Sequence, residues 1–248
     1  MAFDPTLKVQ EVNLEPNAFK FKSPFALAIS GPSQSGKSHF ILNLLKNHEV
    51  MFDCVFQRVI YCQPSSLIHT SNAYFSSIKA IFPYAELVSG LPSISRLHLD
   101  INGSPPALLI IDDLQTEFLN SIEMLHFLTA GVNHFQISCI VTLQSYYGKS
   151  RFGKSLLRNV TYKCFFLNRL DRRELKYISM EIAPSFPNFM ESNFNFLFEN
   201  FPKYSQYILI DGHFASSIPN LYVRSNLFPE KDNVIRPIVF FPNSQNLK

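Results

Sequence analysis

The chain has few of the residues that build disulfide frameworks, zinc sites or membrane spans. Its 248 residues include only four cysteines, and no two of them have the C-x-x-C spacing typical of zinc ligands. Cys62, Cys139 and Cys164 fall in apolar runs, so we expect reduced, buried thiols and an intracellular protein. No apolar run reaches the roughly 18 residues that cross a bilayer, and no signal peptide opens the chain. We therefore expect a soluble protein without a membrane partner.

Charge, glycine and tryptophan are also scarce. Charged residues make up 17%, the net charge is +3, and this mild basicity permits nucleic-acid contact without demonstrating it. There is no tryptophan, but 25 phenylalanines and 10 tyrosines contribute to a hydrophobic fraction of 46%, enough for a sizeable core. Only 8 glycines occur in the whole chain, and two of them lie in one short motif.

That motif is a complete G-x-x-x-x-G-K-S phosphate-binding loop. An apolar run precedes it and a helix-like pattern follows it, as a triphosphate site requires. Backbone N–H groups are expected to wrap the β-phosphate, Lys37 to reach the β and γ oxygens, and the Ser38 hydroxyl to hold Mg²⁺. The expected cofactors are ATP and Mg²⁺. The residues predicted to contact the nucleotide are Gly31, Pro32, Ser33, Gln34, Ser35, Gly36, Lys37, Ser38 and His39.

Two further strand ends carry polar residues suited to phosphoryl transfer. An apolar run ends in Asp112 and Asp113, and the carboxyl ends of parallel strands gather around the ligand of such a sheet. Asp112 is predicted to hold Mg²⁺, and Asp113 to orient and polarise the attacking water. A later apolar run, 137–143, ends at Gln144, whose amide can contact both the γ-phosphate and that water.

Phosphoryl transfer also requires positive charge on the γ-phosphate, which an arginine of a neighbouring subunit often supplies. Three arginines that follow Gln144 are candidates for this role, namely Arg151, Arg158 and Arg169, and the first two are singled out. Arg158 follows an apolar pair near a predicted helix end, and Arg151 lies closer to the strand that carries Gln144. A surface position or a contact with a phosphate backbone is the alternative for each.

Short apolar runs alternate with helical patterns, which predicts an α/β protein with a mostly parallel central sheet flanked by helices. We expect an N-terminal arm or edge strand at 1–23, an ATPase core at 24–203, and strands with an extended tail at 204–248, the strands forming a small antiparallel edge. The strands are predicted at 25–30, 57–62, 85–88, 107–112, 137–143, 161–167, 207–210 and 221–223. The helices are predicted at 37–47, 72–81, 115–130, 151–159, 171–182 and 189–200.

Taken together, these motifs resemble the genome-packaging ATPases of large DNA viruses, the poxvirus-type branch of the FtsK/HerA superfamily of P-loop proteins. The resemblance covers roughly residues 24–170 and rests on the order of four segments. It implies a RecA-like core, a homo-oligomeric ring, ATP-driven movement of double-stranded DNA, and capsid or portal proteins as partners. It also implies a nuclear or virus-factory location, or association with the virion. The segments are 31–38, 111–113, 133–138 and 141–145.

Other classes of protein remain open from the sequence. The segment 168–171 imitates the guanine-reading motif of GTPases, but no D-x-x-G follows the predicted fourth strand. A small-acceptor kinase would need a lid rich in glycine and arginine, which is not evident. A helicase or general DNA translocase of the same superfamily, or a non-catalytic nucleotide-binding scaffold, would carry the same loop.

Overall fold

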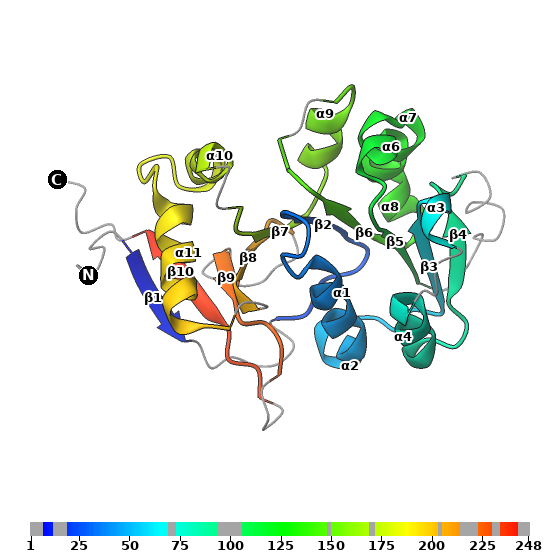
Figure 1. Cartoon of the computed structure of the whole chain (residues 1–248), viewed down its shortest axis with the longest axis horizontal. Helices are drawn as coiled ribbons and strands as arrows, with labels where there is room; N and C mark the ends of the chain where they lie inside the picture. The colour runs from blue at the N-terminus through cyan, green and yellow to red at the C-terminus, as the bar shows by residue number, and fades with distance from the viewer. Residues whose placement is uncertain are drawn as a thin grey trace.

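A computed structural model places all the main elements in one α/β layer arrangement (Figure 1). A ten-stranded sheet runs through the molecule in the order β1-β10-β9-β8-β7-β2-β6-β5-β3-β4. The structure describes residues 7–11, 19–68, 73–93, 106–147, 150–168, 172–202, 205–213, 223–229 and 234–242.

One half of the sheet is parallel and contains the predicted core strands. In this half, β2 pairs with β6 and β7, β5 lies between β6 and β3, and β4 pairs with β3. A single strand, β6, thus separates the strand before the phosphate loop from the strand before the acidic pair. This order is that of a RecA-like P-loop NTPase, so the predicted fold class is confirmed. The strands are β2 (Ala26–Ser30), β3 (Arg58–Gln63), β4 (Glu86–Ser89), β5 (Ala107–Ile111), β6 (Ile137–Leu143) and β7 (Tyr162–Phe166).

The other half of the sheet is antiparallel and extends outward from β7. It consists of β8 (Tyr207–Asp211), β9 (Val223–Ser225), β10 (Ile238–Pro242) and β1 (Leu7–Glu11). The prediction of an extended tail is wrong for β10, because Ile238, Val239 and Phe240 are buried and pair with neighbouring strands. Proline and asparagine around this short run suggested a tail, but burial of its apolar side chains outweighs them.

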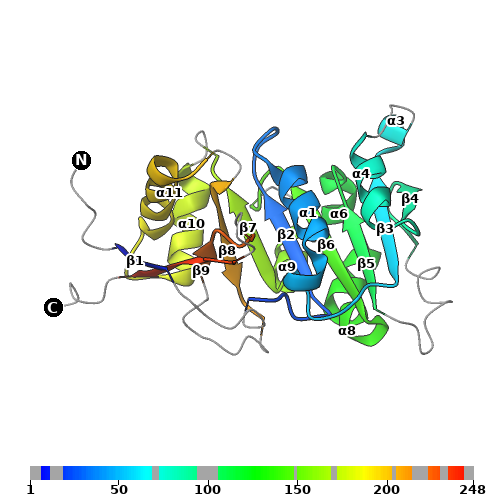
Figure 2. The ribbon, with the colours of Figure 1, turned by 90° about the horizontal axis from the view of Figure 1, so that it is seen from below.

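The helices cover both faces of the sheet. In Figure 2, α1 lies across the strands β2 and β6, whereas Figure 1 shows α9, α10 and α11 on the opposite face. The helices on the side of α1 are α1 (Lys37–Lys46), α2 (His48–Met51) and α4 (Ala73–Ile81), and α3 (Ser65–Ile68) follows β3. Those on the other side are α6 (Gln115–Asn120), α7 (Ile122–His126), η2 (Phe127–Gly131), α8 (Val132–Phe135), α9 (Gly153–Arg158), α10 (Arg172–Ile182) and α11 (Phe189–Asn200).

The predicted helix 115–130 differs most from the structure. It is interrupted at Ser121, whose extended backbone lets its hydroxyl cap the next helix by accepting a hydrogen bond from Met124 N. The helical path then continues beyond the predicted end to Phe135, and Gln136 turns the chain into β6 with a left-handed backbone, φ 55°. A local serine cap inside an apolar periodic pattern explains why periodicity alone misplaced these bounds.

The central strands are buried on both faces, which explains their continuous apolar runs. In β5, Leu108 and Ile110 pack with the helices on the side of α1, and Leu109 and Ile111 pack with those on the other side. Cys62, Cys139 and Cys164 are buried free thiols, as predicted, and Cys54 is partly buried. No helix in the described ranges is long and apolar enough to cross a membrane.

A buried ion pair lies in the antiparallel half. Arg224 on β9 is 1% exposed and contacts Asp211 at the end of β8, with 3.1 Å between Arg224 Nη2 and Asp211 Oδ2. The other carboxylate oxygen, Oδ1, accepts a hydrogen bond from His213 N at 3.1 Å. Because an isolated buried charge is costly, Arg224 and Asp211 depend on each other.

Candidate functional site

The phosphate loop joins β2 to α1 and is attached to the neighbouring strand β6. Gly31 N, the first donor of the loop, bonds to Leu143 O at 3.1 Å, so the loop starts beside the end of β6. Within the loop, Ser35 N bonds to Pro32 O at 3.2 Å. The helix then begins at Lys37, directly after Gly36. The strand, loop and helix predicted from the sequence are all present.

The two glycines of the loop are needed for different reasons. Gly36 has φ 115°, a backbone that other residues rarely adopt, and this conformation turns the chain into α1. At Gly31, an added Cβ would lie 2.6 Å from Phe166 Cβ and 2.9 Å from Ser35 Oγ. Gly31 is therefore required by its packing against Phe166 at the end of β7.

The Lys37 side chain lies along the loop. Its ammonium group donates to Gly31 O at 2.7 Å and to Pro32 O at 2.9 Å, and the residue is buried. Burial lowers the pKa of Lys37 below its usual value, and the negative charges of Asp113 and Asp112 oppose this shift. The lysine and both carboxylates therefore lie within electrostatic reach of one another.

Asp112 is a buried carboxylate held by two hydroxyl groups. Thr142 Oγ1 donates to its Oδ1 at 2.7 Å, and the Tyr61 hydroxyl donates to its Oδ2 at 2.8 Å. Burial raises the pKa of Asp112, whereas these two hydrogen bonds act in the opposite direction. β3 supplies Tyr61 and β6 supplies Thr142, so both strands that flank β5 orient this side chain.

Asp113 differs from its neighbour in both exposure and backbone. It is exposed and has φ 54°, a left-handed conformation that aspartate tolerates better than most residues. Its backbone N–H donates to Thr142 Oγ1 at 3.0 Å. Thr142 Oγ1 thus donates to the carboxylate of Asp112 and accepts from the backbone N–H of Asp113. Asp112 faces inward, while Asp113 remains open to solvent.

Gln144 lies at the end of β6, immediately after the residue that accepts the hydrogen bond of Gly31. Its side chain is exposed, and its backbone N–H donates to Oε1 of Gln115. The structure therefore places the backbone of Gln144 beside the start of the phosphate loop, and the contact of its amide with the γ-phosphate stays a prediction.

Arg158 and Arg151 lie away from the phosphate loop, and Arg169 lies outside the described residues. Arg158 is the last residue of α9 and precedes β7. The first residue of β7, Tyr162, pairs with Leu27 near the start of β2, whereas the phosphate loop follows the end of β2. Arg151 is exposed, and its guanidinium lies 5.0 Å from the centre of the Phe152 ring. Neither arginine belongs to the cluster around Lys37, so their predicted role toward a neighbouring subunit stays a prediction.

The residues present fit a nucleotide and a magnesium ion. The first turn of α1 has no side-chain cap and no acidic residue, so its N–H groups and positive dipole end favour an anion. Ser35 Oγ is buried and has no hydrogen-bond partner among the described residues. Ser38 is exposed in the first turn, and one hydroxyl with one or two carboxylates matches the few protein oxygens that Mg²⁺ usually takes.

Three residues of this site were missed in the sequence. Tyr61 and Thr142 are internal to apolar strands, where nothing marks them as partners of Asp112. Gln115 lies just after the acidic pair, but its contact with Gln144 depends on two strands coming together. The only signal for Thr142 was a hydroxyl near the end of the run 137–143, two residues before Gln144.

No protein-family model matches the chain, and no curated protein is detectably similar to it in sequence. Among solved structures, it is similar to the genome packaging NTPase B204 of Sulfolobus turreted icosahedral virus 2. The complex with ATP-gammaS has 17% identity and a TM-score of 0.49, with 76% of this chain and 93% of B204 covered. The complex with sulfate has 18% identity, a TM-score of 0.49, and coverage of 75% and 91%. A KaiC-like protein from Pyrococcus horikoshii has 16% identity, a TM-score of 0.37, and coverage of 58% and 72%. The strand order and the loop geometry identify this chain as a protein with a P-loop NTPase fold.

Proposed function

We propose that this protein is an ATP-hydrolysing motor that moves double-stranded DNA and packages a viral genome into a preformed capsid. The observation that carries the hydrolytic part is that Lys37, at the uncapped N-terminus of α1, lies within electrostatic reach of Asp112 and Asp113. The DNA-packaging part rests on the order of the motifs along the chain, which resembles that of the packaging ATPases.

Each residue of the site has a separate role in this proposal. When bound, ATP and Mg²⁺ supply the bond to be cleaved and the positive charge that polarises it. The N-terminus of α1 and Lys37 bind the phosphates, and Ser38 and Asp112 offer oxygens to the metal. Asp113, which is open to solvent, accepts a proton from water, and Gln144 orients that water.

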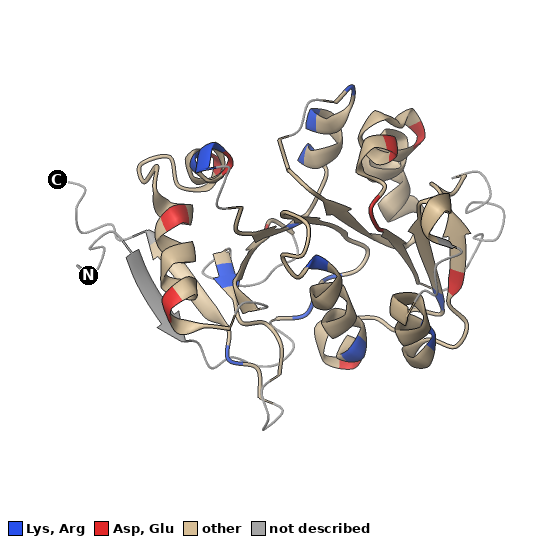
Figure 3. Ribbon diagram, in the orientation of Figure 1, with Lys and Arg blue, Asp and Glu red and all other residues tan. Residues whose placement is uncertain are grey.

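The same proposal includes a ring of identical subunits. An arginine that reaches the γ-phosphate of a neighbouring subunit must be exposed, and Arg151 and Arg158 both are. In a ring, α9 would present basic residues to partners, since it carries Lys154 and Arg158 but no acidic residue (Figure 3). Duplex DNA and capsid or portal proteins are the partners that this assembly requires.

The decisive experiment measures steady-state ATP hydrolysis with and without double-stranded DNA, together with the mass of the protein in the same buffer. We expect an oligomer whose hydrolysis rises with duplex and is abolished by Lys37→Ala. Lys46→Ala is the matched control, because Lys46 is an exposed lysine in the last turn of the same helix. Unchanged turnover in Lys37→Ala would refute the site. Phosphate transfer to a nucleoside in a DNA-independent monomer would instead indicate a kinase.

A further inference from the structure

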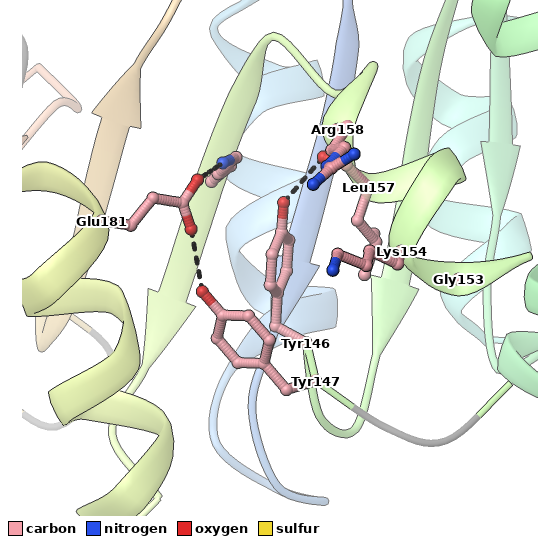
Figure 4. Close-up of a pocket in the computed structure, with 8 residues that line it drawn as sticks. Tyr146, Tyr147, Gly153, Lys154, Leu157, Arg158 and Glu181 are labelled. Atoms are coloured by element: carbon pink, nitrogen blue, oxygen red, sulfur yellow. Dashed lines mark hydrogen bonds and ion pairs between the residues drawn. The ribbon is translucent and has the colours of Figure 1, made fainter.

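A second pocket lies on the sheet face opposite α1, between α9 and α10 and over β7 (Figure 4). Its volume of about 590 Å³ lies within the range of roughly 300–1,000 Å³ typical of small-molecule sites. It shares no lining residue with the phosphate loop or the acidic pair. The lining consists of Tyr146, Tyr147, Gly153, Lys154, Leu157, Arg158, Lys163 and Glu181.

The pocket has an excess of positive charge. Among its described lining residues, only Glu181 carries a carboxylate, which accepts from Lys163 Nζ at 2.7 Å and from the Tyr147 hydroxyl at 2.8 Å. Burial opposes ionisation of Glu181, but the hydrogen bonds from Lys163 and Tyr147 and the charges of Lys163 and Arg158 outweigh it and lower its pKa. The positive charge of Lys163 therefore offsets the negative charge of Glu181, and Lys154 and Arg158 remain as the excess cations.

These two cations have a favourable arrangement. Lys154 and Arg158 are four residues apart on α9, so they project from the same face of the helix. Figure 4 shows both side chains on the α9 wall, across the pocket from Glu181. Both are exposed, so an incoming anion can reach them without opening the core.

The pocket also offers aromatic surface. Tyr146 is buried and is fixed by its hydroxyl, which donates to Leu157 O at 2.8 Å. Tyr147 is 44% exposed, and its ring centre lies 5.2 Å from that of Tyr146 and 5.9 Å from that of Tyr177. A planar ring of a ligand can therefore stack against Tyr147 while its anionic group faces α9.

We propose that this pocket binds a small phosphorylated molecule with a planar aromatic ring, of the nucleoside monophosphate class. Lys154 and Arg158 bind the phosphate, and Tyr147 stacks on the ring. Binding here does not depend on the proposed motor function. Arg151 is not among the lining residues, so it stays available to a neighbouring subunit when the pocket is filled.

The position of the pocket also connects it to the candidate active site. Tyr146 follows Gln144 by two residues, and its backbone N–H donates to Glu174 Oε1 at 2.5 Å. Glu174 belongs to α10, so this bond ties the segment after β6 to the helix that borders the pocket. A molecule that holds α9 and α10 together would therefore restrain the segment that carries Gln144.

The test uses radiolabelled AMP in equilibrium dialysis with the full chain carrying Lys37→Ala. AMP lacks the β and γ phosphates that the phosphate loop binds, so the measured binding reports the second pocket. We expect one AMP per chain, with adenosine and inorganic phosphate each competing more weakly than unlabelled AMP. Added Lys154→Ala or Arg158→Ala should weaken AMP at least tenfold.

Two further variants keep the result interpretable. Tyr147→Phe should retain most of the affinity because it keeps the ring, whereas Tyr147→Ala should lose it. Arg151→Ala is the matched control and should bind AMP normally, and thermal unfolding of each variant verifies its fold. Absence of AMP binding at millimolar concentration, or equal losses in Arg151→Ala and Lys154→Ala, would overturn the proposal. ATP binding by the unsubstituted chain is measured separately and tests only the phosphate loop.

Discussion

Thr142→Val tests how the candidate site is assembled. Valine keeps the branched shape and volume of threonine but removes the hydroxyl, which donates to Asp112 Oδ1 and accepts from Asp113 N. The change therefore breaks two hydrogen bonds at once in a residue that is 1% exposed. No residue predicted from the sequence to act in catalysis is altered.

The expected loss follows from the two bonds. A hydrogen bond to a charged group contributes about 1.5–3 kcal/mol, and one between neutral groups contributes about 0.5–1.5 kcal/mol. Losing both would cost about 2–4.5 kcal/mol of unfolding free energy, which lowers the Tm of a chain of this size by about 4–18 °C. Because Asp112 then keeps only Tyr61 as a hydroxyl donor, its carboxylate turns more freely, and ATP hydrolysis should fall by about 10–10²-fold.

Differential scanning fluorimetry and steady-state ATP hydrolysis measure the two effects. Thr142→Ser is the matched control, since serine restores the hydroxyl and should recover most of both quantities. If Thr142→Val unfolds and hydrolyses ATP like the original chain, the hydroxyl does not hold the carboxylates. If Thr142→Ser is as impaired as Thr142→Val although serine keeps the hydroxyl, the two hydrogen bonds do not explain the loss.

Asp113→Asn should preserve ATP binding but reduce hydrolysis by ~10²–10⁴-fold, because the amide keeps the shape of the carboxylate but cannot act as a base. Binding and single-turnover assays separate these effects, and intact turnover would exclude Asp113 as the base. An inactive Arg151→Ala protein should be partly rescued by mixing with Lys37→Ala, since one junction in a mixed ring pairs an intact arginine with an intact loop; activity independent of protein concentration in a monomer would contradict this. Burial lowers the pKa of His213 below its usual 6.5, so the folded chain takes up this proton less readily than the unfolded chain. Stability should therefore fall as pH drops below about 6.5, and His213→Gln should flatten that decline in denaturant titrations.

The sequence predicted the phosphate loop and the polar residues that follow apolar runs, and missed the partners that lie inside neighbouring strands. The phosphate loop is a local motif, so its strand, turn and helix could be predicted with bounds that differ by one residue at one end of each element, 25–30 against Ala26–Ser30 and 37–47 against Lys37–Lys46. Tyr61 contacts Asp112 across 51 positions of sequence, and only the order of the strands brings them together. The same reason explains β10, whose short apolar run becomes a strand because β9 and β1 lie on either side of it.

The half-exposed ring of Tyr147 makes this chain convenient for optical measurements. The protein contains no tryptophan, so its own emission comes from tyrosine alone. A single Tyr147→Trp substitution would place the sole indole at the mouth of the second pocket, next to Tyr177. Excitation selective for indole would then report that one surface, without background from the core. A change in its emission on adding a compound could be assigned to the rim of the pocket, and the rate of that change would follow filling in real time.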